Sequence, residues 1–194
     1  MKAGASVILI LTLTLSVLCG GAGQAADLGK EFLQKPWGAP LSEFPGYINV
    51  GGSGKIGYYF NPKQAYTIFD AQVSDLVYGF YEERFFAVYV RLEAIDTYSS
   101  IKREIQQKFG VPKISMESRG GLTTYSWKTG DTRIKMKYRE AAGAMKLAIY
   151  YQPIANRVNL ELHQEMDAEP PEPRFPLSQS RQKDAVELLD LFNY

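Results

Sequence analysis

The chain between residues 46 and 92 shows the short alternation of apolar and polar positions that is typical of β-strands. Tyr, Phe, Val and Ile dominate this stretch, and turn-forming residues separate its apolar runs. Strands are therefore expected at residues 56–60, 66–69, 76–81 and 85–92. Along the last strand, alternation predicts that Phe86 shares a face with Val88, while Phe85 shares the other face with Tyr89. Glu82 and Glu83 occupy the position of a tight turn.

Residues 98–109 change to a helical period, with Tyr98, Ile101, Ile105 and Phe109 along one face. Asp96 or Thr97 is the expected N-cap, and Gly110 ends the helix. Strands are expected again at residues 114–118, 122–128, 132–139 and 146–152, joined by short turns. Short connections favour antiparallel pairing. We therefore predict an α+β fold, a mostly antiparallel sheet of five to seven strands covered by one principal helix, residues 98–109.

Both ends of this body are harder to assign. Residues 27–44 suggest one or two helical turns interrupted by Pro36 and Pro40, while residues 157–166 fit a strand or a helix, with a slight preference for strand. Residues 169–177 are rich in proline and predict an extended linker. Residues 178–194 predict a C-terminal amphipathic helix. A single globular domain is expected over residues 27–168.

Residues 1–26 have the layout of a cleaved signal peptide, with Lys2 before a short apolar run and small residues at Gly23 and Ala25. The run is shorter than the about 20 residues of a membrane span. Cys19 leaves a lipoprotein signal open, although Leu18 and Ser16 depart from that pattern. The protein is therefore expected to be exported, periplasmic or secreted, with a membrane attachment only if Cys19 is lipidated.

Charge and cysteine content narrow the classes of partner. The chain has 22 Lys plus Arg and 21 Asp plus Glu, so removal of Lys2 with the signal leaves a net charge of zero. This balance gives no electrostatic basis for binding nucleic acid. Cys19 is the only cysteine, so a mature chain cleaved after it has no disulfide. We expect no cofactor and leave the oligomeric state open.

One predicted strand carries a candidate binding face. Cations alternate with apolar residues along residues 132–139, which places Arg133, Lys135, Lys137 and Arg139 on one side. Such a stripe is suited to an anionic protein surface, a cell-wall polymer or a lipid head group. A solvated face with acidic neighbours, or a charged edge strand that resists aggregation, would explain it equally well.

A second candidate surface is apolar. We expect three tyrosines to reach solvent and the tail helix to offer an apolar side for docking. The candidate interaction residues are Tyr59, Tyr81, Tyr89, Val186, Leu189 and Phe192.

Catalytic groups are scarce. His163 is the only histidine, which excludes a metal site built on several histidines. The carboxylate pairs Glu82 with Glu83 and Glu93 with Asp96 leave a cell-wall polymer hydrolase as an alternative. The Gly51–Lys55 segment lacks the Ser or Thr and the helix of a phosphate-binding loop.

The order of strands, a helix ending in Phe-Gly-x-Pro and later hairpins with a Trp is similar in layout to small exported bacterial domains that bind other proteins. These include the β-lactamase-inhibitor-like architecture, and the similarity covers residues 46–152. Layout does not fix function. The sequence thus predicts a non-catalytic binding module of the cell envelope, with an envelope protein as its partner.

Overall fold

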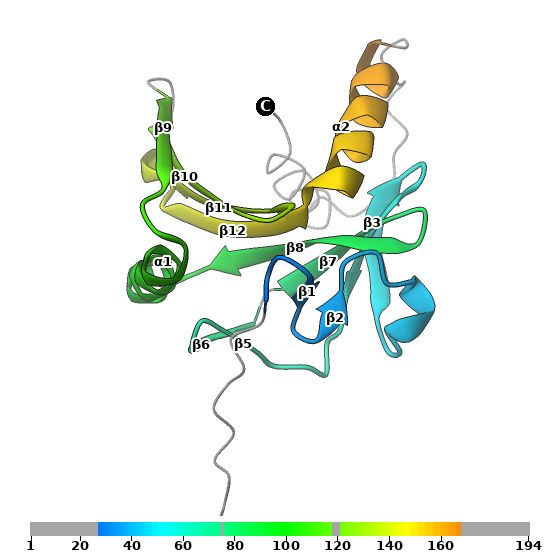
Figure 1. Cartoon of the computed structure of the whole chain (residues 1–194), viewed down its shortest axis with the longest axis horizontal. Helices are drawn as coiled ribbons and strands as arrows, with labels where there is room; N and C mark the ends of the chain where they lie inside the picture. The colour runs from blue at the N-terminus through cyan, green and yellow to red at the C-terminus, as the bar shows by residue number, and fades with distance from the viewer. Residues whose placement is uncertain (1–26, 75, 118–120, 168–194) are drawn as a thin grey trace, which may run out of the picture.

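The computed structural model describes residues 27–74, 76–117 and 121–167 (Figure 1). The strands are β1 Glu31–Phe32, β2 Lys35–Pro36, β3 Ile48–Ser53, β4 Ile56–Phe60, β5 Tyr66–Ile68, β6 Ala71–Val73, β7 Leu76–Tyr81, β8 Arg84–Leu92, β9 Lys113–Glu117, β10 Leu122–Thr129, β11 Thr132–Arg139 and β12 Ala144–Tyr151. The helices are α1 Ile95–Phe109 and α2 Gln152–Asp167, with 3-10 turns at Leu41–Glu43 and Glu140–Ala142.

Eight of these strands form one antiparallel sheet in the order β3-β4-β7-β8-β12-β11-β10-β9. Most neighbours in the sheet are also neighbours in sequence, because tight hairpins connect them. The α+β class and the antiparallel sheet are confirmed, and the sheet is larger than the predicted five to seven strands. The prediction missed β3, whose Gly51 and Gly52 obscure its strand pattern.

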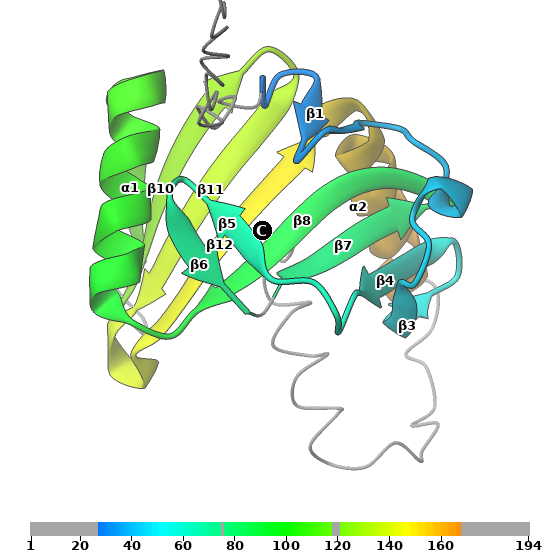
Figure 2. The same ribbon diagram turned by 90° about the horizontal axis from the view of Figure 1, so that it is seen from below.

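One face of the sheet packs against α1, the β5–β6 hairpin and the N-terminal segment (Figure 2). Alternating side chains of the central strands meet there, so that Val88, Ile134 and Leu147 are fully buried together with Ile101 and Ile105 of α1. The helix ends at Gly110, whose positive φ of 82° closes the last turn as expected. Its N-cap is Ala94, without a side-chain hydrogen bond. The expected capping role of Asp96 or Thr97 is wrong, and Asp96 lies in the first turn, where its charge favours the helix dipole.

The opposite face carries a second apolar cluster beneath α2. Ala155 and Val158 of the helix are buried there with Tyr58 of β4 and Tyr89 of β8. The slight preference for a strand at residues 157–166 is therefore wrong. Helical spacing brings Ala155, Val158 and Leu162 to one side of α2, and packing of that side on the sheet decides between two patterns that the sequence fits equally well.

A β-bulge changes the faces of two predicted residues, because Phe86 is an extra residue between the pairs Gly79–Ala87 and Phe80–Phe85. Phe85 belongs with Val88 to the cluster beneath α1, whereas Phe86 belongs with Tyr89 to the cluster beneath α2. Simple alternation placed Phe86 with Val88 and Phe85 with Tyr89, and both assignments are wrong because the bulge shifts the register.

The N-terminal segment also differs from its prediction. Residues 27–44 contain the β1–β2 hairpin and a single 3-10 turn rather than one or two helical turns. Leu33 and Gln34 form the two-residue hairpin loop with φ of 47° and 64°. The signal peptide with Cys19, the proline-rich linker and the C-terminal helix lie outside the described residues.

Candidate functional site

Strand β11 has the boundaries that its alternation predicts, and it lies inside the sheet between β10 and β12. Ile134 and Met136 are fully buried in the cluster beneath α1. The intervening cations Arg133, Lys135 and Lys137 therefore point to the other face, the one that α2 partly covers. An internal strand needs no charge to protect a free edge, so the edge-strand explanation of this stripe is excluded.

Strand registers add further cations to the stripe. Lys137 lies opposite Lys146 of β12, which in turn lies opposite Arg91 of β8. Arg133 lies opposite Lys128 of β10. Because directly paired residues share a face, these positions form a continuous surface, which we name the cationic face. Its members are Arg91, Lys113, Lys128, Arg133, Lys135, Lys137, Arg139 and Lys146.

Acidic residues are scarce on this surface. Among the described residues of strands β8 to β12, the registers place only Glu117 of β9 on the same side, in line with Arg139. The described strands therefore do not support the explanation that the stripe is a solvated face with acidic cross-strand neighbours. Like charges in directly opposed positions, such as Lys137 and Lys146, destabilise a sheet.

Lys137 is the most buried member of the cationic face, with 6% of its surface exposed. Burial, followed by the charges of Lys135 and Lys146, lowers the pKa of its ammonium group from 10.5 to about 7, and Glu117 opposes this change. Burial and the charge of Arg133 likewise lower the pKa of Lys135.

The border of the cationic face toward α2 is built from specific contacts. Arg133 donates from Nε to Oε1 of Gln152, the first residue of α2, at 2.9 Å. The Lys135 ammonium lies 5.6 Å from the centre of the Tyr150 ring. Figure 1 shows strands β9 to β12 curving toward the side on which α2 stands. The face therefore combines positive charge with an aromatic border.

Two of the three candidate interaction tyrosines are not exposed. Tyr81 and Tyr89 have 6% and 1% of their surface accessible, and both belong to the cluster beneath α2. The expectation that they reach solvent is wrong, because α2 was not predicted to pack on this part of the sheet. Tyr59 is half-buried against the cluster beneath α1. Val186, Leu189 and Phe192 lie outside the described residues.

Tyr81 instead helps to fix α2. Its hydroxyl donates to Oε1 of Glu161 at 2.6 Å, and Lys55 Nζ approaches the same oxygen at 2.8 Å. Lys55 also pairs with Glu82 at 3.0 Å. These contacts hold the pKa of Glu161 below its usual value and raise that of Lys55. The Gly-rich turn before Lys55 thus leads into β4 and serves a structural ion pair.

The carboxylates proposed for hydrolysis lie far apart. Glu82 and Glu83 form the loop before β8, whereas Glu93 and Asp96 follow its end, and all four are exposed. The nine residues of β8 span roughly 30 Å. Glycosidase carboxylates are about 5–9.5 Å apart. The two pairs therefore cannot act on the same bond, and the hydrolase alternative gains no support.

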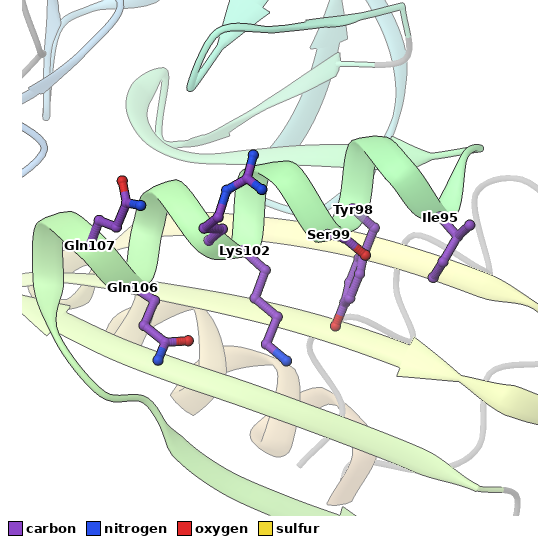
Figure 3. Close-up of a pocket in the computed structure, with 7 residues that line it drawn as sticks. Ile95, Tyr98, Ser99, Lys102, Gln106 and Gln107 are labelled. Atoms are coloured by element: carbon purple, nitrogen blue, oxygen red, sulfur yellow. The ribbon is translucent and has the colours of Figure 1, made fainter.

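A hollow of about 600 Å³ lies along α1 and is lined by residues of that helix alone, among them Tyr98 and Lys102, which are directed toward the strands (Figure 3). Lys102 extends from it toward the strands, where its ammonium lies 3.6 Å from the centre of the Tyr125 ring. This cation is engaged in a cation–π contact. The hollow brings together no pair of groups suited to catalysis.

Within the described residues, no group of three or more His, Cys, Asp or Glu side chains is placed to hold a metal ion. The same part of the chain has no helix that is long and apolar enough to span a membrane. Comparisons with protein-family models, with curated proteins and with solved structures find no significant match to this chain.

Proposed function

We propose that this protein is an exported, non-catalytic binding module of the bacterial cell envelope, and that its cationic face binds an acidic protein surface. The observation that carries the proposal is the concentration of cations on one side of five adjacent strands, where Glu117 is the only acidic residue beside them among the strand residues that the structure describes. Complementary charge speeds association and selects partners.

The burial of a lysine inside the cationic face also supports a role in binding. Lys137 is almost fully buried among Lys135 and Lys146, where its charged form is disfavoured. A fold that needed only stability would gain from an apolar residue at such a position. An acidic partner would instead lie beside several cations at once and stabilise their charged forms.

The test is cross-linking and mass spectrometry in native envelope extracts, with the intact protein and a Lys135→Glu variant. Lys135 is half-buried beside Arg133, so a carboxylate there lies among cations and should not harm folding. The matched control is Lys63→Glu, an exposed charge outside the cationic face. We expect Lys135→Glu to lose specific cross-links that Lys63→Glu retains.

The expected cross-links also weaken as salt is raised, since screening shortens the range of exposed charges. Retention of every cross-link in Lys135→Glu would refute the proposal. Binding of the intact protein to phosphatidylglycerol vesicles, with no protein cross-links, would replace it with lipid binding.

The predicted C-terminal helix supplies a second contact in this proposal. Its apolar side chains Val186, Leu189 and Phe192 would bind the same partner beside the cationic face. A chain that ends at residue 169 tests this part separately. If truncation leaves all cross-links in place, the tail takes no part in binding while the cationic face still does.

A further inference from the structure

A cavity of about 820 Å³ is lined by residues of the β1–β2 hairpin, the β5–β6 hairpin and α1. These three elements lie on the other side of the sheet from the cationic face (Figure 2). The volume of the cavity falls in the range of small-molecule sites, about 300–1,000 Å³. The apolar part of its lining consists of Leu28, Phe32, Leu33, Tyr66, Ile68 and Phe69. Neither the cationic face nor the proposed function uses this cavity.

Two strained turns meet at this cavity. Leu33 and Gln34 form the loop between β1 and β2, and Phe69 and Asp70 form the loop between β5 and β6. All four have a positive φ, from 47° to 64°. Loops of this kind strongly prefer Asn-Gly or related pairs, because a side chain in the left-handed region costs roughly 1–2 kcal/mol.

In both hairpins a large apolar residue therefore occupies the first loop position at a cost in conformational free energy. Leu33 and Phe69 are half-buried, and both line the cavity. Backbone strain of this kind is concentrated at functional sites, where it holds a side chain in a particular position. The third such loop shows the same relation, because Glu82 has a φ of 48° and its carboxylate binds Lys55.

The charged part of the lining is mainly acidic. Glu31 and Glu104 are half-buried and Asp70 is exposed, and together they outnumber the one lining cation, Lys108. Lys108 lies 5.5 Å from the centre of the Phe109 ring. An apolar wall with a surplus of carboxylates fits a molecule that has an apolar body and a positively charged group.

We propose that this cavity binds a small amphiphile of that class, an apolar molecule with an amine or quaternary ammonium group. The apolar part lies between Leu33 and Phe69, and the cation faces Glu31 and Glu104. The site is independent of the cationic face and carries the opposite charge, so either can exist without the other.

The test uses the full-length protein and displacement of the neutral fluorescent probe N-phenyl-1-naphthylamine. Dodecyltrimethylammonium and dodecyl sulfate serve as competitors below the concentrations at which they form micelles. We expect the cationic competitor to displace the probe at least about tenfold more tightly than the anionic one, a difference of about 1.4 kcal/mol. Equal or stronger displacement by dodecyl sulfate would overturn the assignment of charge.

Two variants locate the binding. Ala65→Trp places a large ring at an exposed position of the lining and should abolish probe binding, whereas Lys63→Trp, two residues away and outside the lining, should leave it unchanged. Glu104→Gln should weaken the cationic competitor severalfold and leave the neutral probe unaffected. Undiminished probe binding in a folded Ala65→Trp protein would refute the site itself.

Discussion

Replacement of Lys137 by Met tests the electrostatics of the cationic face directly. Lys137 is buried, and its pKa is lowered from 10.5 to about 7. Each factor of ten in a protonation equilibrium corresponds to about 1.4 kcal/mol. Folding with Lys137 charged therefore costs roughly 4–5 kcal/mol on this basis, and Met fills a similar volume without the charge.

The sign of the pH dependence follows from linkage. Below pH 7 the lysine is charged in both the folded and unfolded states, so the cost is fully present. As pH rises from 7 toward 10.5, the folded protein loses this proton first, and the wild type is progressively relieved of the cost. The variant has no such group. Between pH 6 and pH 9, the wild type should gain roughly 2.5 kcal/mol of unfolding free energy relative to Lys137→Met.

Urea unfolding at several pH values measures this difference, with the fluorescence of the tryptophans as the signal. Titrating groups that do not interact with Lys137 are shared by the two proteins and cancel. Lys63→Met is the control, because its side chain is exposed and should produce no pH-dependent difference. A difference between wild type and Lys137→Met that stays constant from pH 6 to pH 9 would show that burial and the cationic neighbours do not lower the pKa of Lys137 as argued.

Three further predictions concern other parts of the molecule. If an acidic partner binds the cationic face, it should favour the charged form of Lys137, so formation of the complex takes up a proton. The affinity for the partner should therefore fall as pH rises from 6 to 9. Calorimetry in buffers of different ionisation enthalpy measures the proton uptake. Glu83→Gly should stabilise the protein by roughly 0.5–1 kcal/mol, because glycine relieves a strain of roughly 1–2 kcal/mol at the φ of 60° and this relief exceeds its entropy cost of roughly 0.5–1 kcal/mol. Glu83→Ala should not stabilise the protein, and a lower midpoint in thermal unfolding for Glu83→Gly would contradict this prediction. Glu161→Gln should speed amide exchange in α2 severalfold, because it weakens the contacts with Tyr81 and Lys55. In the wild type, amide exchange in α2 should also become faster as pH falls through the lowered pKa of Glu161. This pH dependence should be absent from Glu161→Gln and present in the exposed control Arg157→Gln.

Local patterns predicted most of the sheet. The alternation along β11 predicted the bounds of this strand and the position of its cations on one face, and Gly110 predicted the end of α1. Such features depend on residues that are close in sequence. Phe86 was misplaced because the bulge that turns it arises from pairing between β7 and β8. The fold of residues 157–166 was undecided because only packing on Tyr58 and Tyr89 distinguishes helix from strand.

The extent of the candidate site depended on contacts that no single segment reveals. Four members of the cationic face were visible along one strand, but Lys146 and Arg91 join them only through the register of β11, β12 and β8. A search for isolated cations between apolar residues in neighbouring strands would have identified Lys146. The cavity was not predictable, since its two loops are separated in sequence and meet only after folding.

The internal position of β11 has a consequence for the kind of partner that the cationic face can select. Hydrogen bonding to β10 and β12 on both sides fixes the backbone, so the Cα atoms of the alternating cations stand about 7 Å apart along the strand, and those of opposed pairs such as Lys137 and Lys146 about 5 Å apart. The attachment points of the charges thus repeat at regular intervals. A partner whose negative charges repeat at the same intervals, such as acidic side chains at every second position of an extended strand, would match several cations at once. A partner with the same total charge in irregular positions would match fewer, and discrimination would rest on spacing rather than on net charge.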